Sequence, residues 1–481
     1  MDLLIILRNK GTIWGNVKWC EAGNVGAASV LRLRRCPDEK NIKNLCILLC
    51  MVLVFTGVTA CARQQEEGNT MADVPASQTE SSEKTEADNT EEVYQELTID
   101  QQQLPEYYDF VSKTYNDILS EKENENIVYA PMNFYLSLSM LSEMTENEAR
   151  KELQNALGYQ NLDKHTIEVQ NFVNFLKQRQ QNDPDGVLGR LNLDNSFWLQ
   201  DTLDYREAVM NKLQMGYGLE VFKGDFTNSE FQKKMTDWVY EKTNHALQPQ
   251  FSDLINSPED NAFSIISTLD YIGQWTDTFD TDDTQKGIFY CGDGTQTECE
   301  FMNSEDEGYK FHDYLKGEDY ISTALRTNTR EKMIFILPDE KQDIYDFWNG
   351  DRLTEILSAW ENDECSKAKL KFSVPKFNCS SKTDLKTIAE KMKVNQVFDP
   401  SSGAFAPLSD DPLYLTDIKQ EASISIDETG CSVASYIHVS AAGAEPKEYD
   451  EVEICLDRPF YYIICKEGVP FLIGFVHNPV E

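Results

Sequence analysis

Histidine is one of the rarest residue types in this sequence of 481 residues. The five that occur are His165, His245, His312, His438 and His477. No G-x-S-x-G, H-E-x-x-H or Walker-type string is present, so the local signatures of serine hydrolases, zinc proteases and P-loop enzymes are missing. We therefore expect a protein that is not an enzyme and that uses no metal ion and no cofactor.

Basic residues are also few. The sequence has 82 Asp and Glu but only 44 Lys and Arg, which gives a formal net charge of -38 at pH 7. A surface of this sign repels phosphate backbones and anionic membrane surfaces, so nucleic acid is not an expected partner. The acidic excess is explained either by solubility and an acidic linker, or by attraction to basic proteins such as cationic proteases.

Long apolar runs are missing as well. The run at residues 45–55 is too short for an ordinary membrane-spanning helix. It follows a basic stretch and precedes Val58-Thr-Ala-Cys61, which resembles the lipobox of bacterial lipoproteins. Cys61 is then the lipidated residue; the alternative is an uncleaved anchor helix with an incidental cysteine. In both cases we expect an exported protein, at the cell surface or in the periplasm, and in the first case only a lipid anchor holds it at the membrane.

The sequence divides into three expected parts. Residues 1–60 form an N-terminal extension with the signal peptide, residues 61–103 an acidic disordered tether, and residues 104–481 the folded domain. From Ala62 to about Glu92 the tether is rich in Gln, Glu, Ser and Thr and has almost no large apolar residue, so this stretch cannot offset the entropy cost of folding. The folded domain has seven cysteines, an odd number without CxxC spacing, which predicts free thiols rather than a disulfide framework.

Apolar periodicity predicts a mixed α+β fold. Residues 107–119 have apolar side chains at three- and four-residue spacing, which is typical of an amphipathic helix. The denser apolar segment after Pro131 predicts a helix that is buried nearly all round. Further helices are expected at 230–243 and 382–392, and strands at 192–199, 321–326, 332–337, 370–374, 422–426 and 460–465. The irregular order of strands and helices argues against a doubly wound parallel sheet.

Several strings along the folded domain resemble the serpin family and occur in the family's order. They include Asn126-Ile-Val-Tyr-Ala-Pro-Met-Asn-Phe, Leu191-Asn-Leu-Asp-Asn-Ser-Phe-Trp-Leu-Gln200, Phe335-Ile-Leu-Pro-Asp339, Val374-Pro-Lys-Phe377 and Gly474-Phe-Val-His-Asn-Pro479. No single string is specific, but their collinearity from about Leu104 to Glu481 is. The resemblance implies the serpin fold, with three β-sheets, eight or nine α-helices and an exposed reactive loop near the C-terminus.

The resemblance also implies a function. A serpin is a suicide inhibitor of serine or cysteine endopeptidases: the target protease cleaves the reactive loop and is trapped covalently when the loop inserts into a sheet. The expected partner is therefore a target protease, and we expect a monomer. The alternative is a non-inhibitory serpin that acts as a cell-surface binding or structural protein.

The reactive loop is implied between residues 424–430 and 458–460. Its hinge comprises Gly430, Cys431, Val433, Ser435 and Ile437. Small or apolar residues alternate with mostly polar ones over residues 431–439, which is typical of a half-buried strand, whereas residues 440–448 have turn composition. No proline and no inward charge opposes insertion. Cys431, Val433 and Ile437 are, however, bulkier or softer than the Ala, Thr and Ser usual in inhibitory hinges.

Two positions are open for the cleaved bond. Counting from Gly430 by the family's spacing gives Ala444-Glu445, and counting back from Pro459 gives Glu448-Tyr449. The small residues before Ala444 favour the first position and a protease with a shallow pocket, such as an elastase-like or subtilisin-like enzyme. A cut after Glu448 requires a glutamate-specific protease.

Serpins control the opening of their main sheet with a polar cluster, usually two Ser, an Asn and a His. The corresponding positions here are Ala130, Asn133, Ser267 and Gln420. Asn133 and Ser267 look like an exchange of the usual Ser and Asn, and Gln420 can donate and accept hydrogen bonds as His does. The resemblance implies a gating network with different wiring; the alternative is ordinary core polarity without a gating role.

Overall fold

The computed structural model describes residues 104–177, 189–304, 311–348, 351–362, 364–431 and 449–480, together with three short N-terminal strands. These strands, β1 (Ile5–Leu7), β2 (Gly23–Val25) and β3 (Ala28–Leu31), pair in the order β1-β3-β2. The chain divides into two compact units, residues 1–92 and 93–481. In the described part of the chain no helix is both long and apolar enough to cross a membrane.

The second unit mixes helices and strands, which confirms the predicted α+β class. Nine α-helices lie in its described part: α2 (Leu104–Glu121), α3 (Pro131–Met144), α4 (Asn147–Leu157), α5 (Leu162–Lys177), α6 (Glu207–Tyr217), α7 (Ser229–Lys242), α8 (Phe251–Leu254), α9 (Arg352–Glu361) and α10 (Leu385–Lys391). The strands are β4 (Ile127–Tyr129), β5 (Gly189–Gln200), β6 (Glu220–Gly224), β7 (Phe263–Gln274), β8 (Gln285–Tyr290), β9 (Gln296–Ser304), β10 (Phe311–Lys316), β11 (Tyr320–Arg326), β12 (Glu331–Pro338), β13 (Ser366–Pro375), β14 (Phe377–Asp384), β15 (Lys419–Ile426), β16 (Gly430–Cys431), β17 (Glu451–Cys455), β18 (Phe460–Lys466) and β19 (Val469–Val476).

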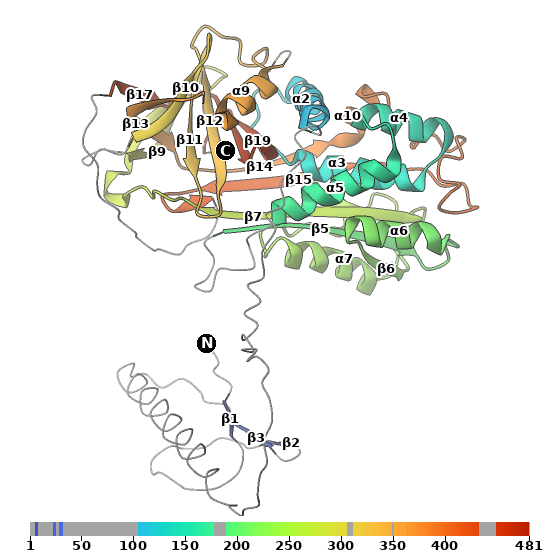
Figure 1. Cartoon of the computed structure of the whole chain (residues 1–481). Helices are drawn as coiled ribbons and strands as arrows, with labels where there is room; N and C mark the ends of the chain where they lie inside the picture. Colours follow the sequence, from blue (N-terminus) through green and yellow to red (C-terminus); the bar gives the residue numbers. More distant parts are fainter. Residues whose placement is uncertain are drawn as a thin grey trace, which may run out of the picture. The chain divides into compact units, whose positions relative to one another are not determined.

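One sheet has six strands in the order β14-β15-β16-β7-β5-β6 (Figure 1). Its longest pairing joins β5 to β7 from Gly189↔Gly273 to Leu199↔Phe263. Successive side chains of a strand point to opposite faces, so Phe197 and Leu199 enter the main core while Trp198 enters a smaller cluster under α7. The sheet is therefore covered on both faces, with α7 on one side.

The other large sheet has ten strands. Its main path runs β4-β19-β18-β12-β11-β10-β13-β9-β8, and β17 pairs in parallel with β13. The second and third sheets implied by the sequence resemblance are continuous here, because β10 pairs with both β11 and β13. Strands β12, β18 and β19 are buried along their whole length, which matches their nearly unbroken apolar sequences.

Helix α3 runs behind the six-stranded sheet and confirms the predicted buried helix. Every residue from Pro131 to Met144 except Ser137 is buried. The hydroxyls of Ser139 and Ser142 donate to the carbonyls four residues earlier, at 2.7 and 3.1 Å, so these polar side chains are satisfied inside the core.

The helix predicted at residues 382–392 starts three residues later. Residues 382–384 are extended and belong to β14, where Lys382 pairs with Glu421 and Asp384 with Lys419. Asp384 is the N-cap of α10, and its side chain accepts from the backbone N–H groups of Lys386 and Thr387. The pairing with β15, which the local pattern does not reveal, keeps these residues in the sheet.

The seven cysteines are free thiols, as predicted. Five of them are buried, whereas Cys365 and Cys455 are partly exposed. Burial raises the pKa of Cys465 to about 12 and that of Cys299 to about 11. Because the thiolate is the reactive form, these two thiols are held in their inert state at neutral pH.

Candidate functional site

Strand β16 holds two neighbouring strands together at one end of the six-stranded sheet. Cys431 pairs with Ile426 of β15 and with Gly273 of β7, and Gly430 pairs with Gln274 of β7. Both pairings are antiparallel, so β15 and β7 run parallel to each other on either side of β16. The start of the predicted hinge is therefore already a strand of the sheet.

A tight turn fixes the approach to β16. Asp427 Oδ1 accepts from the backbone N–H of Thr429 at 2.8 Å and of Gly430 at 3.2 Å, and from the Thr429 hydroxyl at 2.6 Å. Trp275 donates from its indole to Asp427 O at 3.0 Å and from its backbone to Thr429 O at 2.9 Å. A Cβ on Gly430 would lie 2.2 Å from Gly273 O, so only glycine allows this close approach.

Cys431 is the last described residue of the predicted hinge and points into the core. Its side chain is 1 % exposed, and Sγ lies 3.6 Å from Met333 Sδ of β12. Burial raises the pKa of the thiol, with Asp427 and Glu331 adding to the effect. The thiol is thus a neutral, apolar contact between the hinge and the second large sheet.

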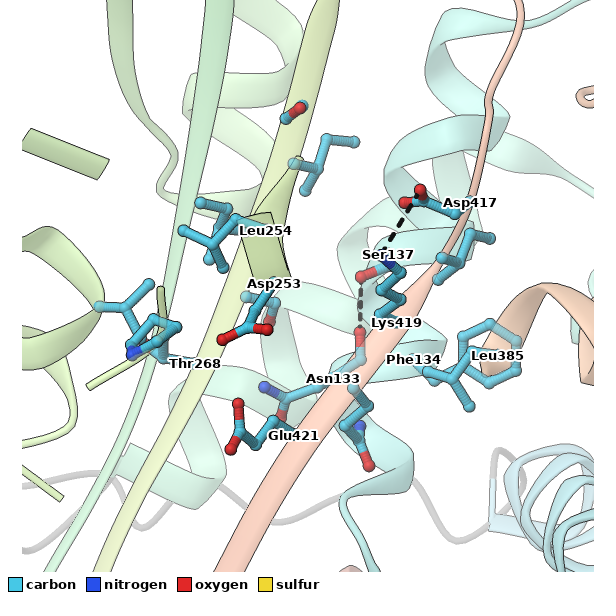
Figure 2. A pocket seen from close by; sticks show the side chains of 18 of the residues that line it. Asn133, Phe134, Ser137, Asp253, Leu254, Thr268, Leu385, Asp417, Lys419 and Glu421 are labelled. Atoms are coloured by element: carbon cyan, nitrogen blue, oxygen red, sulfur yellow. Dashed lines mark hydrogen bonds and ion pairs between the residues drawn. The ribbon is translucent and has the colours of Figure 1, made fainter. Parts of the chain in front are cut away.

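Beyond Cys431 a cavity of about 520 Å³ separates β7 from β15. Among the described residues, no backbone pairing joins these two strands directly. The cavity is lined by β7, β15, α3, the segment around α8 and residues 412–418, with Cys431 also in its wall. Figure 2 shows β7 and β15 passing on either side of this space, with α3 behind it. A gap between two parallel strands is the shape that an additional antiparallel strand fills.

The four residues of the predicted sheet-opening cluster all line this cavity. Gln420 and the backbone of Ala130 exchange two hydrogen bonds: Ala130 N donates to Oε1 at 2.9 Å and Nε2 donates to Ala130 O at 3.0 Å. Asn133 Oδ1 and Ser267 Oγ are buried and have no hydrogen-bond partner among the described residues. The cluster thus joins α3 to β15 through one pair and leaves two buried polar atoms without a partner among the described residues. Its gating role stays a prediction.

Further polar residues, which the sequence reasoning missed, bridge the gap from the α8 side. Asn256 Nδ2 donates to Asp417 at 2.5 Å, and Lys419 Nζ donates to Asn256 Oδ1 at 2.8 Å. Lys382 Nζ lies 3.8 Å from Asp253 and 3.6 Å from Glu421. Asn256 and Asp253 lie more than 100 positions from these partners and carry no motif, so only the fold brings them together.

The other predicted site residues lie mostly outside the described residues. This applies to the hinge beyond Cys431, that is Val433, Ser435 and Ile437, and to Ala444, Glu445, Glu448 and Cys61. Tyr449 is described and partly buried. The chain continues into β17, where Glu451 pairs with Lys369 of β13, so the two described ends of the loop segment belong to different sheets.

Comparison with known proteins identifies the fold. A sequence profile described as Serpin (serine protease inhibitor) matches residues 106–479. This chain belongs to the serpin family. The match spans the whole described body of the second unit and confirms the resemblance seen in the sequence.

Individual relatives of this serpin are distant but cover the same region. An alpha-1-antitrypsin-like protein of Ictidomys tridecemlineatus is 25% identical over 389 residues, covering 78% of this chain and 88% of the relative. Neuroserpin of Mus musculus is 24% identical, covering 76% of this chain and 89% of the relative.

Solved structures support the same fold. Human thyroxine-binding globulin complexed with its ligand has a TM-score of 0.68 at 20% identity, covering 79% of this serpin and 99% of that chain. Tengpin, a thermophilic serpin in the native state, has a TM-score of 0.67 at 20% identity, covering 79% and 95%. The family consists mostly of protease inhibitors rather than catalysts, but the structure of thyroxine-binding globulin shows that its fold also serves a binding protein.

Proposed function

We propose that this serpin is a suicide inhibitor of serine or cysteine endopeptidases. The observation that supports it is the position of β16, whose residues pair with both β7 and β15 at the mouth of a gap one strand wide. Gly430 and Cys431 of the proposed hinge thus pair within the sheet, and we infer that the following residues insert into the gap ahead of Cys431.

The mechanism needs no catalytic group of the serpin. The protease attacks a loop carbonyl with its own nucleophile, the peptide C–N bond breaks, and the new amino terminus leaves while the serpin stays attached as an acyl-enzyme. The freed hinge then extends β16 antiparallel to both neighbours. About ten residues at roughly 0.5–1.5 kcal/mol per hydrogen bond release on the order of 10 kcal/mol, which is comparable with the whole stability of an ordinary domain. Insertion can thus pull the protease along and deform its active site before water releases it.

For the cleaved bond we propose Ala444-Glu445, with Glu448-Tyr449 as the alternative. The run Ser440-Ala-Ala-Gly-Ala444 is small, so it suits an elastase-like or subtilisin-like protease with a shallow pocket. Tyr449 directly precedes Asp450 and β17, which pairs with β13. A cut so close to a paired strand leaves less free chain for a protease to bind, and this also favours the first bond.

For location we propose an exported lipoprotein. The basic stretch, the apolar run at 45–55 and the lipobox-like Val58-Thr-Ala-Cys61 support lipidation of Cys61. Residues 61–103 then form a tether between the membrane and a monomeric inhibitor domain. Such an arrangement would hold the inhibitor at the cell surface or in the periplasm, where it meets proteases outside the cytoplasm.

The proposal is tested by incubating the purified chain from residue 104 onward with an elastase-like and a subtilisin-like protease. We expect a complex that survives SDS and heating, with a mass equal to protease plus serpin less the C-terminal fragment. We also expect the loop-cleaved protein to melt at a much higher temperature than the intact protein. Cleavage without a complex and without this rise in melting temperature would support the non-inhibitory alternative instead.

A further inference from the structure

The gap between β7 and β15 has a chemical character that loop insertion does not explain. We propose that it is also a binding site for an amphipathic organic amine, with the apolar part on the floor of the cavity and the ammonium group at its acidic rim. The volume of about 520 Å³ is in the range that accommodates a drug-sized molecule.

The floor of the cavity is apolar but contains unsatisfied hydrogen-bonding atoms. Phe134, Leu254 and Leu413 are among the apolar residues that line it. Asn133 is only 7 % exposed, and no donor among the described residues reaches its Oδ1. Figure 2 shows the Asn133 amide turned from α3 into the space between the strands. A buried acceptor without a donor is unfavourable, so a ligand N–H group at this point is favoured.

The rim carries more negative than positive charge. Its carboxylates are those of Asp253, Asp260, Asp417 and Glu421, against the ammonium groups of Lys419 and Lys382. Asp253 and Glu421 share Lys382 at 3.8 and 3.6 Å, distances longer than a hydrogen bond, and their side chains are 39% and 34% exposed. In Figure 2 these two carboxylates lie near each other beside the gap, as their shared contact with Lys382 requires. Asp253 also accepts the backbone N–H of Gln250 at 2.9 Å, but each carboxylate still has lone pairs for a further cation.

The hinge of the same chain does not need this charge. Residues 431–440 contain neither Lys nor Arg, so an acidic rim gives their insertion no electrostatic help. A cationic ligand uses both the apolar floor and the rim, whereas a neutral or anionic ligand of the same shape uses only the floor. Charge at the rim is thus the property that selects the ligand.

The test uses dansylcadaverine as the amine and its N-acetylated form, which has the same apolar body without the charge. Fluorescence titration of the intact protein should show the amine binding at least tenfold more tightly. Asp253→Asn combined with Glu421→Gln should remove most of this preference, and Asn133→Leu should weaken binding several-fold. The matched control, Glu148→Gln with Asp237→Asn, removes two exposed carboxylates on α4 and α7 and should bind as the parent does.

Equal affinity for the two probes, or a preference that survives the rim variants, would overturn the proposal. Because the titration measures binding to the intact protein, it does not depend on inhibition. If the loop inserts after cleavage, bound dansylcadaverine should be released at the same time. If cleavage does not release dansylcadaverine, while the preference for the amine and the effects of the variants persist, loop insertion is contradicted and the amine site is supported.

Discussion

Cys431 is the residue at which the hinge meets the core. It points inward against Met333. If the following residues insert as a strand, alternation predicts that Val433 faces inward and Ser432 outward. The buried thiol of Cys431 thus fixes the position of the hinge against the core. The identity of the next inward residue then decides whether the strand can extend.

Val433→Arg should turn the inhibitor into a substrate. The guanidinium would enter the sheet on insertion at a cost of several kcal/mol, whereas the intact protein should change in stability by less than about 0.5 kcal/mol. Cleavage should continue, because the residues around Ala444 are unchanged, but deacylation should outrun insertion. Gel analysis should show cleaved serpin in place of the SDS-stable complex.

The control for that change is Ser432→Arg, which carries the same charge on the outward face. It should still form the complex at close to the parent's stoichiometry. If Val433→Arg forms complexes as well as the parent does, the hinge assignment is wrong.

His165 gives the folded domain a pH dependence. Its ring is 2 % exposed, stacks on Tyr159 with centroids 4.5 Å apart, and has Nε2 2.9 Å from Ser139 Oγ. Desolvation lowers its pKa from 6.5 to about 4. Between these two values the unfolded chain binds a proton that the folded chain does not, so stability is lost as the pH falls through this window, by up to about 3 kcal/mol.

His165→Gln should therefore flatten the fall of unfolding free energy between pH 6.5 and 4, measured by urea titration at several pH values. The control is His245→Gln, at a ring that is about half exposed, and its profile should match the parent's in shape. An unchanged slope in His165→Gln would contradict the assignment of this titration to His165.

At the scale of elements, the turn before β16 restricts the conformations open to the start of the hinge. Asp427 accepts hydrogen bonds from Thr429 and Gly430, and the same turn is bound to Trp275 at the end of β7. A turn held in this way restricts the hinge before any protease arrives. It therefore reduces the conformational entropy that the hinge loses on insertion.

Asp427→Ala should destabilise the intact protein by about 1–3 kcal/mol, because the turn loses its acceptor. It should also raise the number of serpin molecules consumed per protease, since a looser hinge inserts more slowly. The control is Asp399→Ala, which removes a similar acceptor in a different turn. Asp399 accepts hydrogen bonds from the backbone N–H and the hydroxyl of Ser401. Asp399→Ala should not change the number of serpin molecules consumed per protease. If it raises this number as much as Asp427→Ala does, the turn before β16 has no special role.

At the scale of the whole molecule, the proposed attachment to the membrane depends on Cys61 alone. Cys61→Ser removes the thiol that would carry the lipid, and the apolar run before it is too short to span a bilayer. The variant should be released or mislocalised, as measured by fractionation and immunoblotting. A variant that stays in the membrane fraction after a high-salt wash would show that another segment anchors the protein.

The folded domain and most of its elements were predictable from the sequence because the signals are local. Helices α2 and α3 follow from apolar spacing within a few turns, and β12 and β18 from short apolar runs. The order of strings along the chain was enough to identify the family, although no single string was. The four residues of the predicted sheet-opening cluster line one cavity, and their gating role stays a prediction.

Only the tertiary structure decided how these elements meet at the gap. Gln420 bonds to Ala130 across 290 positions, Asp253 and Asn256 approach β15 from the far side, and residues 382–384 join a sheet although their local pattern favours a helix. Periodicity reports which face of an element is buried, but it carries no information on which distant strand lies beside it. The sequence by itself therefore determined the family and most of the elements, whereas the hinge segment stays a prediction. The width of the gap, the two unpartnered atoms inside it and the charge at its rim arise from contacts between distant segments.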